Sequence, residues 1–240
     1  MKYALVDGQR QEAKRGLSAK CPGCEAPMVA KCGEVKIWHW AHLGKLDCGL
    51  FWENETEWHR AWKGQFPEDW QEVYHRAENG DKHIADVKTD QGWVIEFQHS
   101  ALKPEERRSR NSFYPKLVWV VDGTRRKRDS QQFKDTLRKG VQVVPNVLCY
   151  KVSSDRNTLL KEWADSDAPV LFDFGPGPSL WWLLPKSPNG KREFVGPFSR
   201  AEFIELHLGG PNNNVQDFEA FLKEFSGLVA GYNSNIQRRR

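Results

Sequence analysis

The pattern of apolar and polar residues predicts an α/β chain. Residues 117–121, Leu-Val-Trp-Val-Val, form a continuous apolar run that is typical of a strand buried on both faces. Residues 54–66 carry apolar side chains at helical spacing, and Asn54 or Thr56 can cap that helix. The other elements predicted for the first 155 residues are strands at 3–6, 28–31, 35–40, 70–76 and 146–152, a hairpin at 83–99, helices at 104–113 and 130–139, and a polar helical stretch before Cys21. This order favours a mixed sheet flanked by helices.

Changes in composition divide the chain into three predicted parts. Residues 1–50 contain most of the cysteines and form a small N-terminal unit. Residues 51–155 hold the α/β core. Residues 156–240 form a small, mainly-β C-terminal region, because Gly-Pro stretches interrupt short apolar runs at 170–174 and 180–184. Two short helices are expected near 200–207 and 215–228.

The bulk composition indicates a soluble, globular protein. Of the 240 residues, 39% are hydrophobic and 28% are charged, which excludes a disordered chain. No apolar run approaches the roughly 20 residues that span a bilayer, and the first residues lack a signal-peptide pattern. We therefore expect a cytoplasmic protein that does not bind a membrane.

Clustered cysteines and histidines predict a structural zinc site near the N-terminus. Cys21 and Cys24 form a CxxC knuckle, and HxxH follows at His39 and His42. Zinc prefers four nitrogen or sulfur ligands, usually supplied as two close pairs. Cys48 offers a competing Cys3His arrangement. Because alternation places the two histidines on opposite strand faces, we expect one of them to bind, and the pattern leaves open whether this is His39 or His42. The set assigned here is Cys21, Cys24, His42 and Cys48.

The hairpin at 83–99 carries acids on strands that also carry aliphatic residues. Asp86 lies on its first strand, and Glu96 and Gln98 lie on its second. Two carboxylates on adjacent strands can hold Mg²⁺ or Mn²⁺, which favours phosphodiester chemistry. Gln98 points to the same side as Glu96 and is expected to position the attacking water. The alternative is an amphipathic hairpin whose acids face solvent.

The helix before the hairpin adds polar residues to this candidate site. Glu55, His59 and Lys63 recur every four residues and therefore share one helix face. One interpretation is a charge ladder in water. The other places Glu55 near the metal as a third acid and turns His59 and Lys63 toward phosphate.

A basic stretch follows the hairpin. Taken alone it favours a solvated helix face, but its position directly after the acidic hairpin favours contact with DNA phosphates. It contains Lys103, Arg107, Arg108, Arg110, Lys116, Arg125, Arg126, Lys127 and Arg128. The net charge of the whole chain is only +4, so the clustering carries the argument. We expect Lys103, Arg107 and Arg110 to follow the nucleic-acid backbone.

Six segments in this order resemble the competence protein CoiA-like family over about residues 1–125. They are CPGC, HWAH, ENETEWHRAWK, IADV, EFQHS and RSRNSFY. That family is similar to the PD-(D/E)XK nucleases and carries an N-terminal zinc-finger-like unit.

The resemblance implies a nuclease-like mixed sheet, and it implies Asp86 and Glu96 as the metal-binding acids. It implies Gln98 where the superfamily usually has lysine, and Glu55, His59 and Lys63 as the helical part of the site. Arg110 and Tyr114 match the family's arginine and tyrosine. Glutamine lacks the positive charge of lysine, so Lys63 is the candidate to supply that charge.

Two functions follow from these residues. The first is a Mg²⁺-dependent deoxyribonuclease that hydrolyses DNA in uptake, recombination or foreign-DNA processing, with uptake or recombination proteins as partners. The second is a non-catalytic, zinc-containing DNA-binding module. Loss of cleavage with retained binding after mutation of Asp86 and Glu96 would separate the two.

Overall fold

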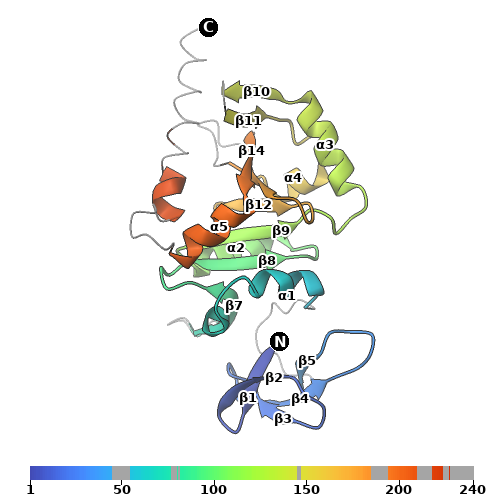
Figure 1. Cartoon of the computed structure of the whole chain (residues 1–240), viewed down its shortest axis with the longest axis vertical. Coiled ribbons are helices and arrows are strands. Elements are labelled where there is room, and N and C mark those ends of the chain that lie inside the picture. The colour runs from blue at the N-terminus through green and yellow to red at the C-terminus, as the bar shows by residue number, and fades with distance from the viewer. Residues whose placement is uncertain are drawn as a thin grey trace. The chain divides into compact units, whose positions relative to one another are not determined.

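The chain divides into two compact units, Met1–Asp90 and Gln91–Arg240. Figure 1 labels the helices and strands along the chain. The structure is a computed structural model of the whole chain, and it describes residues 1–44, 55–76, 80, 82–144, 147–184, 194–209, 218–223 and 227. The division after Asp90 lies inside the middle part that the sequence predicted. One reason is that residues of the N-terminal sheet bond to Glu68, Gln71 and Glu72, so residues up to 90 are compact together.

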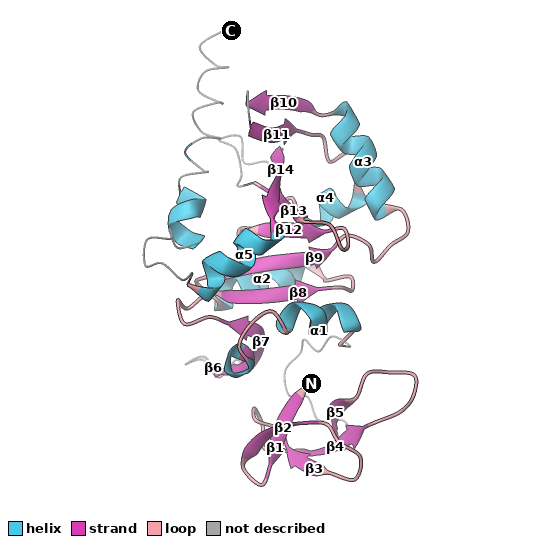
Figure 2. Cartoon of the chain, in the orientation of Figure 1, coloured by secondary structure: helices cyan, strands magenta, loops and turns pink. Residues whose placement is uncertain are grey.

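The first unit begins with a small antiparallel sheet (Figure 2). Its strands are β1 (Tyr3–Val6), β2 (Gln9–Glu12), β3 (Ser18–Lys20), β4 (Pro27–Lys31) and β5 (His39–His42), in the order β2-β1-β3-β4-β5. Its core includes Ala4, Val6, Ala19, Met28 and Trp40.

The predicted polar helix before Cys21 is wrong, because residues 9–12 and 18–20 are strands. Asp7 and Gly8 both have positive φ, at 49° and 79°. Two such residues make the tight turn that joins adjacent antiparallel strands. The chain therefore turns back on β1 at this point and cannot continue as a helix.

The rest of the first unit contains the helix α1 (Glu57–Lys63), the short 3₁₀ helix η1 (Glu68–Trp70), and the strands β6 (Gln71–Arg76) and β7 (Lys82–Lys88). Strands β6 and β7 pair antiparallel. Thr56 caps α1 through its hydroxyl, which confirms one of the two caps expected from the sequence. The predicted helix was longer, and Asn54 lies outside the described residues.

The second unit is a mixed sheet flanked by helices. Its elements are β8 (Val94–Gln98), α2 (Pro104–Phe113), β9 (Leu117–Asp122), α3 (Asp129–Lys139), β10 (Val141–Val144), β11 (Val147–Lys151), α4 (Thr158–Trp163), β12 (Val170–Asp173), β13 (Ser179–Leu183), β14 (Phe194–Ser199) and α5 (Arg200–Leu208). Among the described strands of this unit the order is β10-β11-β14-β13-β12-β9-β8. Strands β8, β9 and β12 are parallel, and the remaining neighbours pair antiparallel.

Strand β9 lies in the core of the second unit. All six of its residues are buried, as the apolar run at 117–121 predicted. On one face, Trp119 packs against Trp163 of α4, with ring centroids 5.2 Å apart. The ring centroids of Phe133 in α3 and Phe172 in β12 are 6.1 Å apart.

The predicted strands at 170–174 and 180–184 are present as β12 and β13, but they do not form a separate small sheet. Strand β12 pairs in parallel with β9, and β13 pairs with β12. All four residues of β12 are buried because this strand lies inside the central sheet. Among the described residues, no helix is both long enough and apolar enough to cross a membrane.

Candidate functional site

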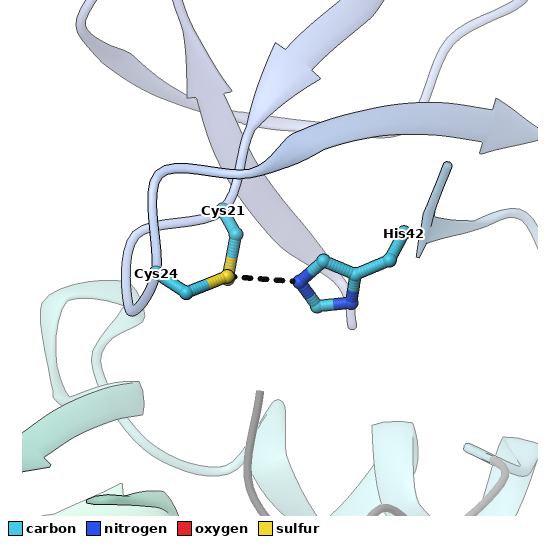
Figure 3. Close-up of side chains that lie close together, drawn as sticks. All are labelled: Cys21, Cys24 and His42. Atoms are coloured by element: carbon cyan, nitrogen blue, oxygen red, sulfur yellow. Dashed lines mark hydrogen bonds between the residues drawn. The ribbon is translucent and has the colours of Figure 1, made fainter. Parts of the chain in front are cut away.

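Three predicted metal ligands lie together at one end of the N-terminal sheet (Figure 3). Cys21 follows β3, Cys24 lies in the turn after it, and His42 ends β5. One potential ligand atom from each residue lies within 4.8 Å of the others, and Cys24 Sγ is 3.4 Å from His42 Nε2. Two thiolates and an imidazole are soft and borderline donors that suit zinc.

The knuckle is shaped by backbone hydrogen bonds. The Cys21 N–H donates to the Ala26 carbonyl at 2.9 Å, and the Glu25 N–H donates to the Cys21 carbonyl at 2.9 Å. The Gly23 N–H lies 3.4 Å from Cys21 Sγ. Such N–H groups stabilise a thiolate, which is the form that binds metal.

The register of β4 and β5 decides between the two histidines. His42 lies opposite Met28, next to the knuckle, whereas His39 lies opposite Lys31 at the far end of the strand. His39 Nδ1 is 2.9 Å from the Ile37 carbonyl. Burial lowers the pKa of His42, and so favours the neutral imidazole that a metal requires. The fourth predicted ligand, Cys48, lies outside the described residues.

The first unit also brings together the predicted residues Glu55, Lys63 and Asp86. The Lys63 ammonium is 2.5 Å from Glu55 Oε1, and both side chains are buried. Burial would lower the pKa of Lys63, but the charges of Glu72, Asp86 and Glu55 overcome it, so the pKa is raised. Lys63 is therefore a fixed cation among three acids.

Glu72 is the acid that the sequence interpretation missed. Its Oε1 is 2.8 Å from the Lys63 ammonium, and its carboxylate accepts the N–H groups of Lys2 and Tyr3. Burial would raise the pKa of Glu72, but Lys63 and these donors hold it well below its usual range. The strand at 70–76 was predicted, but nothing in its pattern showed that this glutamate meets a lysine nine residues earlier.

His59 has a role at the helix terminus. It is 3% exposed, and its Nδ1 accepts the Thr56 N–H at 3.2 Å. The Thr56 hydroxyl in turn lies 3.4 Å from the His59 N–H, which completes a capping box. These contacts support a structural function for the ring, and its predicted catalytic role stays a prediction.

In the second unit, Glu96 and Gln98 lie on β8 and are each 2% exposed. Arg110 of α2 donates to Glu96 Oε2 at 2.6 Å and to Glu106 Oε1 at 3.0 Å. The Gln98 amide donates to the Ser100 carbonyl at 3.2 Å. The family's arginine therefore contacts the predicted metal-binding glutamate.

The predicted basic face of α2 is only partly exposed. Arg107 is buried and bonds to the Glu162 carbonyl and the Asp165 carboxylate. Arg110 is buried in its pair with Glu96. Both guanidinium groups are thus engaged inside the protein, which argues against direct phosphate contact. Lys103 is exposed and is still available for that role.

A histidine–carboxylate pair lies at the ends of β8 and β9. His99 Nδ1 is 2.7 Å from Asp122 Oδ2, and the other oxygen of Asp122 accepts the Thr124 N–H and hydroxyl. By strand alternation, His99 lies on the opposite face from Glu96 and Gln98. The signal in the sequence is an aspartate that ends a buried apolar strand.

Asp86 belongs to the first unit and Glu96 to the second, so a metal shared between them stays a prediction of the sequence. Within the first unit, Lys63 forms one buried ion-pair network with Glu55 and Glu72. Within the second, Glu96 is paired with Arg110.

A family model described as "Competence protein CoiA, N-terminal domain" matches residues 7–51. The matched segment contains the knuckle, His39 and His42, and it extends past Cys48. No curated protein and no solved structure gives a significant match to the chain. The similarity to this family is thus confined to a small part of the chain, which contains β2 to β5 and the Cys/His cluster.

Proposed function

We propose that this chain is a metal-dependent deoxyribonuclease that acts in DNA uptake or recombination. The observation that carries the proposal is that Asp86 of β7 lies near the pair formed by Glu55 and Lys63 at α1, as expected for one site. The competence-family match to the N-terminal sheet gives the context of DNA uptake.

The proposed site uses oxygen donors that suit a hard cation. We assign Asp86 and Glu96 to Mg²⁺ or Mn²⁺, with Glu55 as a further acid, because these cations prefer carboxylate oxygens. When bound, the cation would lower the pKa of a water molecule and offset negative charge on the scissile phosphate.

Side chains of the protein supply the remaining functions. Lys63 provides the positive charge that Gln98 cannot provide. Arg110 fixes the Glu96 carboxylate through their 2.6 Å contact. Gln98 is assigned to orienting the attacking water through its amide oxygen, since its NH2 group donates to the Ser100 carbonyl.

A second candidate is a zinc-containing DNA-binding module without catalysis. The burial of Glu96 and Gln98 and the pairing of Glu96 with Arg110 favour it. In this case, the Cys/His cluster stabilises the N-terminal sheet, and the acids serve only as partners in ion pairs.

Cleavage of labelled single- and double-stranded DNA with Mg²⁺ or Mn²⁺ tests the proposal. The native chain should cut, and Asp86→Ala and Glu96→Ala should bind DNA but not cut it. Asp90→Ala is a matched control, since Asp90 is an exposed acid four residues after Asp86. If the native chain binds DNA but cuts with neither metal, the second candidate stands and the nuclease proposal fails.

A further inference from the structure

Glu72 has a backbone conformation that glutamate rarely adopts. It lies in β6 with φ of 48°, in the left-handed region that favours glycine. Its side chain is 6% exposed. A bulky residue persists in this conformation only where its surroundings fix it. We therefore expect contacts of the Glu72 carboxylate to hold the backbone in place.

The carboxylate of Glu72 connects two parts of the first unit. On one side it accepts the Lys2 N–H at 2.8 and 2.9 Å and the Tyr3 N–H at 3.0 Å, at the start of β1. On the other side it contacts the Lys63 ammonium, at the end of α1. The same group therefore fastens the N-terminal sheet and holds the cation of the proposed site.

Neighbouring contacts hold this connection in place. Arg10 of β2 donates to the Gln71 carbonyl and, at 2.5 Å, to the Glu68 carbonyl. The Lys2 ammonium donates to Gln71 Oε1 at 3.2 Å. The sheet that carries the Cys/His cluster is thus bonded directly to η1 and β6.

The strand register places Glu72 beside a predicted metal-binding acid. Gln71 pairs with Val87 and Val73 pairs with Ala85, so Glu72 and Asp86 occupy the intervening positions on neighbouring strands. Lys63 is buried among Glu55, Glu72 and Asp86.

We propose that Glu72 is a positioning residue that fixes the Lys63 ammonium against Glu55 and makes the N-terminal sheet a required part of the nuclease site. Its effect on cleavage rests on the function proposed above. The effect of Glu72 on the position of Lys63 does not depend on that function. The position of Lys63 and the cleavage of DNA are therefore measured separately.

The full-length chain is compared with Glu72→Gln, Glu72→Gly and the control Glu68→Gln. Glutamine keeps an oxygen that accepts the N–H groups of Lys2 and Tyr3, but it removes the charge that holds Lys63. Glycine removes the carboxylate and is favoured at this positive φ, so this variant tests the proposal if glutamine prevents folding. Glu68 is an exposed acid four residues away.

The first readout is acylation of Lys63 by acetic anhydride in the folded protein, mapped by mass spectrometry. Lys63 should be protected in the native chain and in Glu68→Gln, and it should lose protection in both Glu72 variants. Protection of Lys63 in folded Glu72→Gly would overturn the proposal.

The second readout is DNA cleavage, with kcat and KM measured separately. Displacement of Lys63 should lower kcat by roughly 10²-fold, with little change in KM. A purely structural role predicts a lower melting temperature with unchanged kcat, and that result would overturn the positioning role. If the native chain cuts no DNA, the nuclease proposal fails, and acylation alone decides whether Glu72 holds Lys63.

Discussion

Mild acid should destabilise the second unit through His207 of α5. The imidazole is fully buried between the rings of Phe203 and Phe218, each with its centroid 4.4 Å away. Its Nδ1 donates to the Phe203 carbonyl at 2.7 Å, and its Nε2 has no hydrogen-bond partner among the described residues. Burial lowers the pKa of His207 from 6.5 to about 4, so the folded protein holds this ring neutral.

The sign and size of the effect follow from linkage. Below pH 6.5 the unfolded chain binds a proton at His207, whereas the folded chain does so only near pH 4. Stability is therefore lost as the pH falls from 6.5 to about 4. At about 1.4 kcal/mol for each pH unit, the full loss is roughly 3 kcal/mol, of which about 2 kcal/mol is reached at pH 5.

Unfolding in urea at pH 7 and pH 5 measures this loss of stability. Hydrogen exchange in peptides that cover α5 reports the unfolding of the second unit. His207→Gln removes the titrating group and should abolish most of the difference between the two pH values. His75→Gln is the control, because burial also lowers the pKa of His75 to about 4, but His75 lies in β6 of the first unit. Equal losses in the native chain and in His207→Gln would refute the reasoning.

Two further outcomes are expected. Cys24→Ser should lower zinc affinity and the melting temperature, whereas Cys32→Ser should leave zinc affinity unchanged, because Cys24 lies with Cys21 and His42 and Cys32 does not; titration with a chromogenic chelator measures the affinity. Arg110→Met should destabilise the fold by about 3–5 kcal/mol by leaving the buried Glu96 without its cation, and adding Glu96→Leu should restore part of the loss in a urea titration. Zinc retained in Cys24→Ser, or a stable Arg110→Met, would contradict these assignments.

Local pattern was enough to predict many elements of this protein. The apolar run at 117–121 predicted the buried β9, and proline followed by polar helix formers predicted α2 at 104–113. The spacing of Cys21, Cys24 and the HxxH pair predicted a metal-binding cluster, and the register of β4 and β5 then selected His42. These features depend on residues near one another in the sequence, or on the period of the secondary structure itself.

Long-range contacts decided the rest. Alternation shows which residues are buried but not which strand they pair with, so β12 was expected in a separate sheet rather than beside β9. Likewise, a count of charges shows many arginines but not that Arg107 and Arg110 find buried acids or carbonyls.

The candidate site shows the same division. The sequence by itself predicted that Lys63 lies on a helix and Asp86 on a strand, whereas Glu55 lies before the first residue of α1 rather than on its face. Only the tertiary structure placed Glu72 between Lys63 and the first residues of β1. The physical reason is that a carboxylate is buried only where charges and N–H donors from distant segments meet it, and that meeting is a property of the folded chain.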